Sequence, residues 1–125
     1  MGFYIQLYSL REAARQDFKG MLERVAKIGY AGVEFAGYGG LSGEEMAALL
    51  KRLGLEAPSS HIGAGRLDAD FEGEAAFLKA IGAKYAVLPY YEIKTDEDAL
   101  AAAELFERYA LAFQEHGIIF AYHNH

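Results

Sequence analysis

Hydrophobic and polar positions along this chain form a pattern that occurs four times. Each time, a stretch with apolar residues at helical spacing runs into a glycine, and a short apolar run follows. The glycines are Gly29, Gly54, Gly82 and Gly117, and the runs are AGVEFAG, LEAPSSHIG, AKYAVLPYY and IIFAYHNH. With FYIQLYSLR at the start, the pattern predicts five strands alternating with four helices. Such alternation is typical of a parallel α/β sheet built from βαβ units.

Capping residues mark where the helices begin. Asp17 precedes the first helical stretch, Ser42 with Glu45 forms a capping-box pattern, and Thr95 with Asp98 repeats it before the longest helix. We therefore expect helices from Asp17 to Gly29, from Ser42 to Gly54, over 71–81 and from Thr95 to Gly117. The first strand is expected over 3–10, and the segments 38–43 and 63–70 are expected to be the more mobile loops.

Composition narrows the function classes. The 125 residues form one predicted domain, 1–125, and the net charge of −6 disfavours nucleic-acid binding. The absence of cysteine excludes disulfides and thiolate chemistry. No apolar stretch approaches the roughly 20 residues of a membrane span, and the amino terminus does not resemble a signal peptide. We expect a cytoplasmic protein without membrane or nucleic-acid partners.

Polar residues gather where the predicted strands end. Because parallel strands present their carboxyl ends at one rim, residues from five segments should meet there. They are Tyr8, Ser9 and Arg11; Glu34; Ser59, Ser60 and His61; Tyr90, Tyr91 and Glu92; and His123 with His125. Of the tyrosines, we expect Tyr8 and Tyr90 or Tyr91 to line a pocket.

Four of these residues have more than one interpretation. His123 and His125 lie two apart on a strand, a spacing that suits one divalent ion such as zinc, manganese or cobalt, but also a hydrogen-bonded and a solvated histidine. His61 is either a hydrogen-bonding residue or a site residue. Glu34 lies among apolar residues, so it needs a partner, for which Arg11 is a candidate, or it is functionally poised.

The segments YSLRE, IGYAGVEFAGYGG, SSHIG and FAYHNH follow one another in an order that resembles the xylose-isomerase-like TIM-barrel family of sugar phosphate isomerases and epimerases. The resemblance spans essentially the whole of this chain, but it covers only the first half of that family's barrel. It implies a small sugar or sugar phosphate as substrate and a divalent metal (Mn, Co, Zn or Mg) that stabilises an enediolate.

Carried onto this chain, the resemblance makes Glu34 and His61 the candidate catalytic residues. It suggests Tyr8, Arg11 and Tyr90 for substrate binding, and His123 and His125 for the metal. His123 falls where many members have a metal-binding glutamate, which is a departure because a metal-bound histidine cannot easily act as a base. The family's remaining ligands come from strands six to eight.

The predicted fold is thus a parallel (βα)4β half of a TIM barrel, whose open edges and apolar inner face need covering. Three alternatives remain: a piece of a longer isomerase, a homodimer that completes the barrel, or a rearranged flavodoxin-like sheet. For function, the alternative to an isomerase or epimerase is an inactive half barrel or a module that binds a ligand or partner. A nuclease of the same superfamily is disfavoured by the acidic charge.

Overall fold

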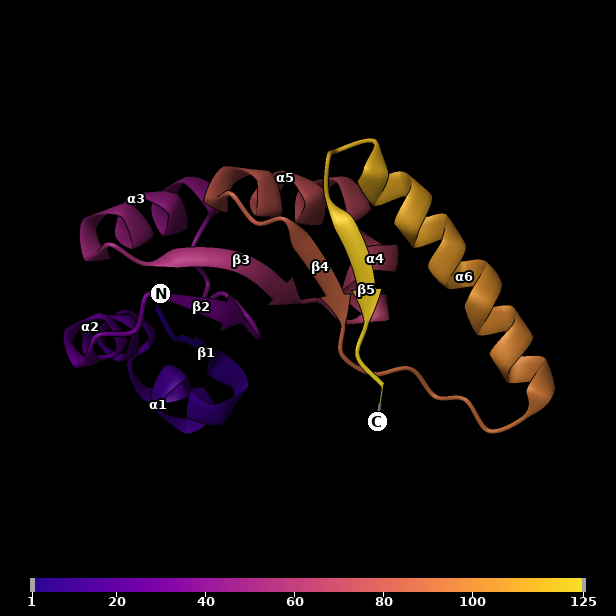
Figure 1. Ribbon diagram of the computed structural model, residues 1–125, viewed down its shortest axis with the longest axis horizontal. Coiled ribbons are helices and arrows are strands. Elements are labelled where there is room, and N and C mark those ends of the chain that lie inside the picture. The colour runs from indigo at the N-terminus through magenta and orange to yellow at the C-terminus, as the bar shows by residue number, and fades with distance from the viewer. Residues whose placement is uncertain (1, 125) are drawn as a thin grey trace.

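The computed structural model describes residues 2–124, and its strands form one curved parallel sheet (Figure 1). The strands are β1 (Tyr4–Gln6), β2 (Gly32–Phe35), β3 (Glu56–His61), β4 (Tyr85–Leu88) and β5 (Ile119–Tyr122). They lie in the order β1-β2-β3-β4-β5, and each neighbouring pair is parallel. Sequential parallel strands with intervening helices are the arrangement of a TIM barrel. The predicted (βα)4β half barrel is confirmed.

The strand order also shows that the flavodoxin-like alternative is wrong. A flavodoxin-like sheet has the order 2-1-3-4-5, with helices on both faces. Here β1 lies at one edge and β5 at the other. Because every crossover moves in the same direction along the sheet, the helices form an arc around its outer side (Figure 1).

The four predicted helices are present, and the three with predicted caps begin at them. They are α2 (Phe18–Ile28), α3 (Gly43–Leu53), α5 (Phe71–Ile81) and α6 (Asp96–Gln114). The Asp17 side chain accepts from the backbone N–H of Gly20, and Ser42 and Thr95 both form complete capping boxes. Gly29, which ends α2, has a φ of 112°, a conformation that other residues rarely adopt. None of the helices within residues 2–124 is long and apolar enough to cross a membrane.

Three short helical elements were not predicted. They are the 3₁₀ helix η1 (Leu7–Leu10), α1 (Arg11–Gln16) and α4 (Ala64–Ala69). Strand β1 therefore ends at Gln6 and not at Leu10, because Leu7 turns into the core, where it is buried. The segment predicted as a loop over 63–70 is mostly helix α4, and Asp70 then caps α5. Helix α6 ends at Gln114, three residues before Gly117.

The sheet packs its outer face against the helices. One buried cluster lies between β2, α2 and α3, and a second between β4, α5 and α6. The largest fully buried side chains include Phe35 and Phe113. Along β4, Ala86 and Leu88 are buried, whereas the alternate residue Tyr85 is exposed. Alternation in a strand thus separates an apolar outer face from an inner face that carries the polar side chains.

Removing the cap of α6 should measurably destabilise the chain. Thr95 accepts from the backbone N–H of Asp98 at 3.0 Å, and Asp98 accepts in return from the N–H of Thr95 at 3.2 Å. We expect Thr95→Ala to lower the free energy of unfolding by about 1 kcal/mol, since it leaves an N-terminal donor of the helix without its acceptor. Urea denaturation measures this loss. Thr95→Ser keeps the hydroxyl and should behave like the parent, so an equal loss in both variants would contradict the capping role.

A tyrosine that joins α6 to α4 predicts sensitivity to alkaline pH. The Tyr109 hydroxyl donates to Asp68 at 2.6 Å. Burial, and then this contact with Asp68, raises the pKa of Tyr109 well above its usual 10.0. As the pH rises past about 10, the phenol ionises in the unfolded chain but stays protonated in the folded chain. We expect stability to fall with pH in this range.

The test compares urea unfolding between pH 8 and 11 for the parent and Tyr109→Phe. The variant should lose part of this pH dependence, by at most about 1.4 kcal/mol per pH unit for one group. Tyr8→Phe, at an exposed tyrosine, is the control. Equal pH dependence in the parent and in Tyr109→Phe would contradict the assignment.

Candidate functional site

The Glu34 carboxylate on β2 lies at the centre of a polar cluster on the inner face. Its Oε2 accepts a hydrogen bond from Ser59 Oγ at 2.5 Å, and its Oε1 lies 3.0 Å from His61 Nε2. The Gln6 amide donates to the same Oε1 at 3.3 Å. The side chains of Glu34 and His61 are 27% and 11% exposed, so the pair is largely shielded from solvent. The expected need of Glu34 for a partner is met by three neighbours.

The register of the sheet brings these residues together. Gln6 pairs with Glu34, and Glu34 pairs with Ser59. Between Gly32 and Glu34 the register shifts, because two residues of β2 oppose three of β3. Pro58, which has no N–H to donate to the ladder, lies in this irregular stretch. The shift places Ser59 and His61 on the same face as Glu34, while Ser60 is buried on the other face.

His61 connects the cluster to a cavity. The Gln6 amide nitrogen lies 3.3 Å from His61 Nδ1 and 3.2 Å from Nε2. The rings of His61 and His123 are 5.7 Å apart, centroid to centroid. Both histidines face a cavity of about 300 Å³, which we call the rim cavity. Its lining residues are Gln6, Tyr8, His61, Pro89, Tyr90 and His123.

The structure therefore brings most of the predicted site residues together. Tyr8 and Tyr90 line the rim cavity as expected of pocket residues, and Glu34 supports it from behind His61. His125 lies outside the described residues. Gln6 was missed, although its signal was visible: it is a polar residue in an otherwise apolar first strand, on the same face as Tyr4 and Tyr8 in the alternation.

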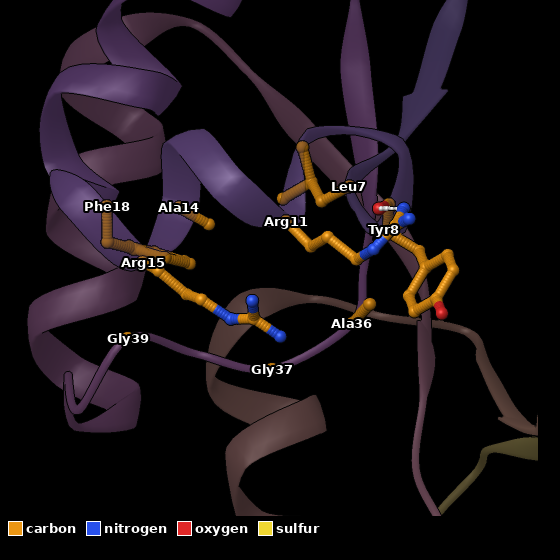
Figure 2. A pocket seen from close by; sticks show the side chains of 9 residues that line it. All are labelled: Leu7, Tyr8, Arg11, Ala14, Arg15, Phe18, Ala36, Gly37 and Gly39. Carbon is orange, nitrogen blue, oxygen red and sulfur yellow. Dashed lines mark hydrogen bonds between the residues drawn. The ribbon is translucent and has the colours of Figure 1, made fainter.

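Arg11 does not pair with Glu34, as the sequence had suggested it could. It lies on α1, where its Nη1 donates to the Tyr8 carbonyl oxygen at 3.0 Å and its guanidinium stacks 4.4 Å above the Tyr8 ring. The η1 turn carries Arg11 away from the strand end. Figure 2 shows it at a second cavity, of about 570 Å³, between α1 and the loop that follows β2.

A second polar group supports the rim from the outer side. The Tyr38 hydroxyl and Ser60 Oγ are 2.8 Å apart, and the Tyr38 ring stacks on Phe77 at 3.7 Å. Arg66 lies 4.9 Å over the same ring and makes two hydrogen bonds to Glu74, at 2.8 and 3.0 Å. Burial raises the pKa of Tyr38, although the contact with Ser60 and the charge of Arg66 oppose it. These contacts hold the 38–43 loop, which was predicted to be mobile, against α4 and α5.

The described residues do not by themselves fit a divalent metal. No group of three or more histidine, cysteine, aspartate or glutamate side chains within residues 2–124 could hold an ion. A zinc site normally needs three or four protein ligands. His123 with His61 and Glu34 does not reach that arrangement, so the predicted metal would need ligands beyond these.

Comparison with solved structures identifies the architecture. A sugar phosphate isomerase/epimerase from Parabacteroides distasonis superimposes with a TM-score of 0.81 and 24% identity, over 99% of this chain and 51% of that one. The fold is half of a TIM barrel. A family 2 AP endonuclease from Brucella melitensis matches with a TM-score of 0.73 and 16% identity, over 98% and 55% of the two chains.

This chain therefore spans about half the length of both structures. No protein-family model and no curated protein matches it. Identities this low support the shared fold alone, and the barrel fold that the sequence predicted agrees with it. What the half barrel does has to be argued from its own residues.

Proposed function

We propose that this half barrel supplies the sugar-binding and proton-transferring rim of an isomerase or epimerase that acts on a small sugar or sugar phosphate. The observation that carries the proposal is the contact between Glu34 and His61, which places a carboxylate-supported imidazole at the wall of the rim cavity. An imidazole is the side chain best suited to take up and return a proton near neutral pH.

The local geometry gives each residue a role. Glu34 orients His61 through Nε2 and stabilises the imidazolium that forms when His61 takes a proton. Ser59 holds the second carboxylate oxygen and thereby fixes the rotamer of Glu34. With Nε2 directed at Glu34, Nδ1 is the nitrogen that accepts the proton from the sugar carbon next to the carbonyl, and the sugar replaces the Gln6 amide that lies 3.3 Å from it.

The proton then returns from His61 to carbon. Return to the neighbouring carbon from the same side, with the hydroxyl proton passing from one oxygen to the other, gives the isomer, so no other reactant is consumed. An epimer requires a second proton donor on the opposite face of the carbon that lost the proton. The negative charge that develops on the carbonyl oxygen needs hydrogen-bond donors. The Gln6 amide and the hydroxyls of Tyr8 and Tyr90 line the same cavity and can supply them.

Exchange of carbon-bound hydrogen tests this proposal directly. Concentrated protein is incubated in D₂O with an aldose, a ketose and their phosphates, with and without Mn²⁺ or Co²⁺, and the proton next to the carbonyl is followed by NMR. We expect its signal to decay faster than in protein-free controls. Binding of the sugar without any exchange, under all metal conditions, would instead support the alternative of a non-catalytic binding module.

A nuclease function has less support. The AP endonuclease matches with a lower TM-score than the isomerase/epimerase, 0.73 against 0.81. The net charge of −6 also works against the phosphate contacts that DNA binding requires.

We also propose that the chain forms the homodimer predicted from its sequence. β1 and β5 are open edges, and the inner face exposes Tyr4, Tyr85 and Ile119, with Phe3 just before β1. Exposed edges and apolar side chains favour association, and a second copy could complete the rim. We expect light scattering coupled to size exclusion to give twice the chain mass of 13.7 kDa. A concentration-independent monomer would contradict the dimer.

A further inference from the structure

We propose that the cavity shown in Figure 2 binds the phosphate group of a phosphorylated sugar. We call it the arginine cavity, after Arg11 and Arg15 in its wall. The inference rests on the proposed function for the sugar, and it adds that the substrate is a phosphate monoester whose anionic end lies in this cavity.

The charge of the cavity differs from that of the chain. The chain as a whole carries a net charge of −6. Among the described residues that line the arginine cavity, two are arginines and none is acidic. Arg11 and Arg15 are four residues apart on α1, so they share one face of that helix. Figure 2 shows the Arg15 side chain extending from α1 toward the loop after β2, and the Arg11 side chain extending toward Tyr8 at the end of the cavity. Two guanidinium groups at one cavity match the geometry of a phosphate better than that of a neutral sugar.

The opposite wall is backbone that a ligand can approach closely. Ala36, Gly37 and Gly39 form it. Gly37 has a φ of 106°, and a Cβ built there would meet no atom within 4 Å, so the missing side chain leaves open space at the cavity. Gly39, at φ 61°, lies so close to Phe18 that a Cβ would be 2.3 Å from its ring. The loop is thus held against α2 while its backbone at Gly37 faces the cavity.

The two arginines differ in how they are held. Arg11 is preorganised by the Tyr8 carbonyl and ring. Arg15 pairs with Glu12 at 2.8 Å, but the two side chains are 72% and 73% exposed. Exposed pairs of this kind are weak, so a phosphate can replace Glu12 as the partner of Arg15.

Tyr8 connects the two cavities. It lines the rim cavity together with His61 and also lines the arginine cavity. A sugar phosphate can therefore lie across Tyr8, with its reacting carbons at His61 and its phosphate between the arginines and Gly37. Binding energy from the phosphate would then hold the carbonyl end in place at the rim.

The test needs no turnover. The ¹⁵N-labelled chain is titrated with inorganic phosphate at constant ionic strength, and the amide signals of Gly37 and Gly39 are followed by NMR. We expect saturable shifts at both glycines, and we expect Arg11→Gln and Arg15→Gln each to weaken binding by about tenfold, the effect of losing one charge-assisted contact. Acetate is titrated in parallel as a carboxylate probe.

Arg52→Gln is the matched control, because Arg52 is also an exposed arginine that pairs with a glutamate, Glu23, at a distant surface. The proposal is overturned if Arg52→Gln weakens binding as much as Arg15→Gln, if acetate binds as tightly as phosphate, or if the glycine signals do not saturate. Phosphate binding without sugar-dependent exchange would refute the proposed function and keep this site. Exchange without phosphate binding would refute this site and keep the proposed function.

Discussion

Replacing Phe35 with alanine is expected to destabilise the chain by about 3–5 kcal/mol, a large share of the roughly 5–15 kcal/mol that holds a typical domain together. Phe35 is fully buried on β2. Its ring stacks with Phe18 at 6.5 Å and meets Tyr38 edge-on at 5.5 Å, so it joins the sheet to α2 and to the loop after β2. Truncation would leave a cavity where α2 packs on the sheet.

Urea denaturation followed by circular dichroism measures this loss. Leu100→Ala truncates an apolar side chain at a position on α6 that is 70% exposed, and it should change stability by less than about 0.5 kcal/mol. Similar losses in the two variants would show that Phe35 does not pack as described. Because Phe35 directly follows Glu34, the unfolded fraction of Phe35→Ala must be measured before its activity is interpreted.

Glu34→Gln is expected to slow the proposed hydrogen exchange by about 100-fold, the lower range for general acid–base catalysis. Glutamine has nearly the shape of glutamate and can still contact Ser59, but it carries no charge to stabilise an imidazolium at His61. In the proposed complex the sugar contacts Tyr8 and Tyr90 and not Glu34, so kcat should fall while KM changes little. Exchange rates over a range of sugar concentrations separate the two.

Two further variants distinguish this role from a structural one. Glu56→Gln removes a second inner-face carboxylate, which contacts the Tyr4 hydroxyl at the opposite end of the strands, and exchange should be unaffected. His61→Asn should slow exchange at least as much as Glu34→Gln does, and the double variant should be no slower than His61→Asn alone, since residues that act as a unit are not additive. Fully additive losses would contradict the proposed coupling of Glu34 to His61.

Much of the site could be placed from the sequence because strand ends in a parallel sheet share one rim. Glu34, His61, Tyr8 and Tyr90 were expected there, and the structure gathers them around one cavity or directly behind it. Their partners could not be predicted. Which side chains touch depends on strand register, and the irregularity beside Pro58 sets the register of Ser59 and His61 against Glu34.

Arg11 shows the same limit at the first strand. Its sequence neighbours FYIQLYSL are compatible with a strand that continues to Leu10. Burial of Leu7 in the core instead ends the strand at Gln6 and starts η1, which moves Arg11 to a different cavity. No local preference of these residues distinguishes the two outcomes, because the difference comes from packing against β2 and α2.

The sequence by itself determined the four longer helices, the caps of three of them, and the alternation of strands and helices; the strand order then decided for the half barrel against a flavodoxin-like sheet. The helices and their caps follow from local signals: Asp17, Ser42 and Thr95 satisfy the N–H groups of the turns that they precede, and Gly29 adopts a backbone conformation that other residues avoid. Only the tertiary structure decided the Gln6–Glu34–Ser59–His61 cluster and the two cavities that meet at Tyr8. These depend on contacts between segments far apart in the chain, up to 55 residues within the cluster itself, whose geometry is fixed by register and packing and not by local preference.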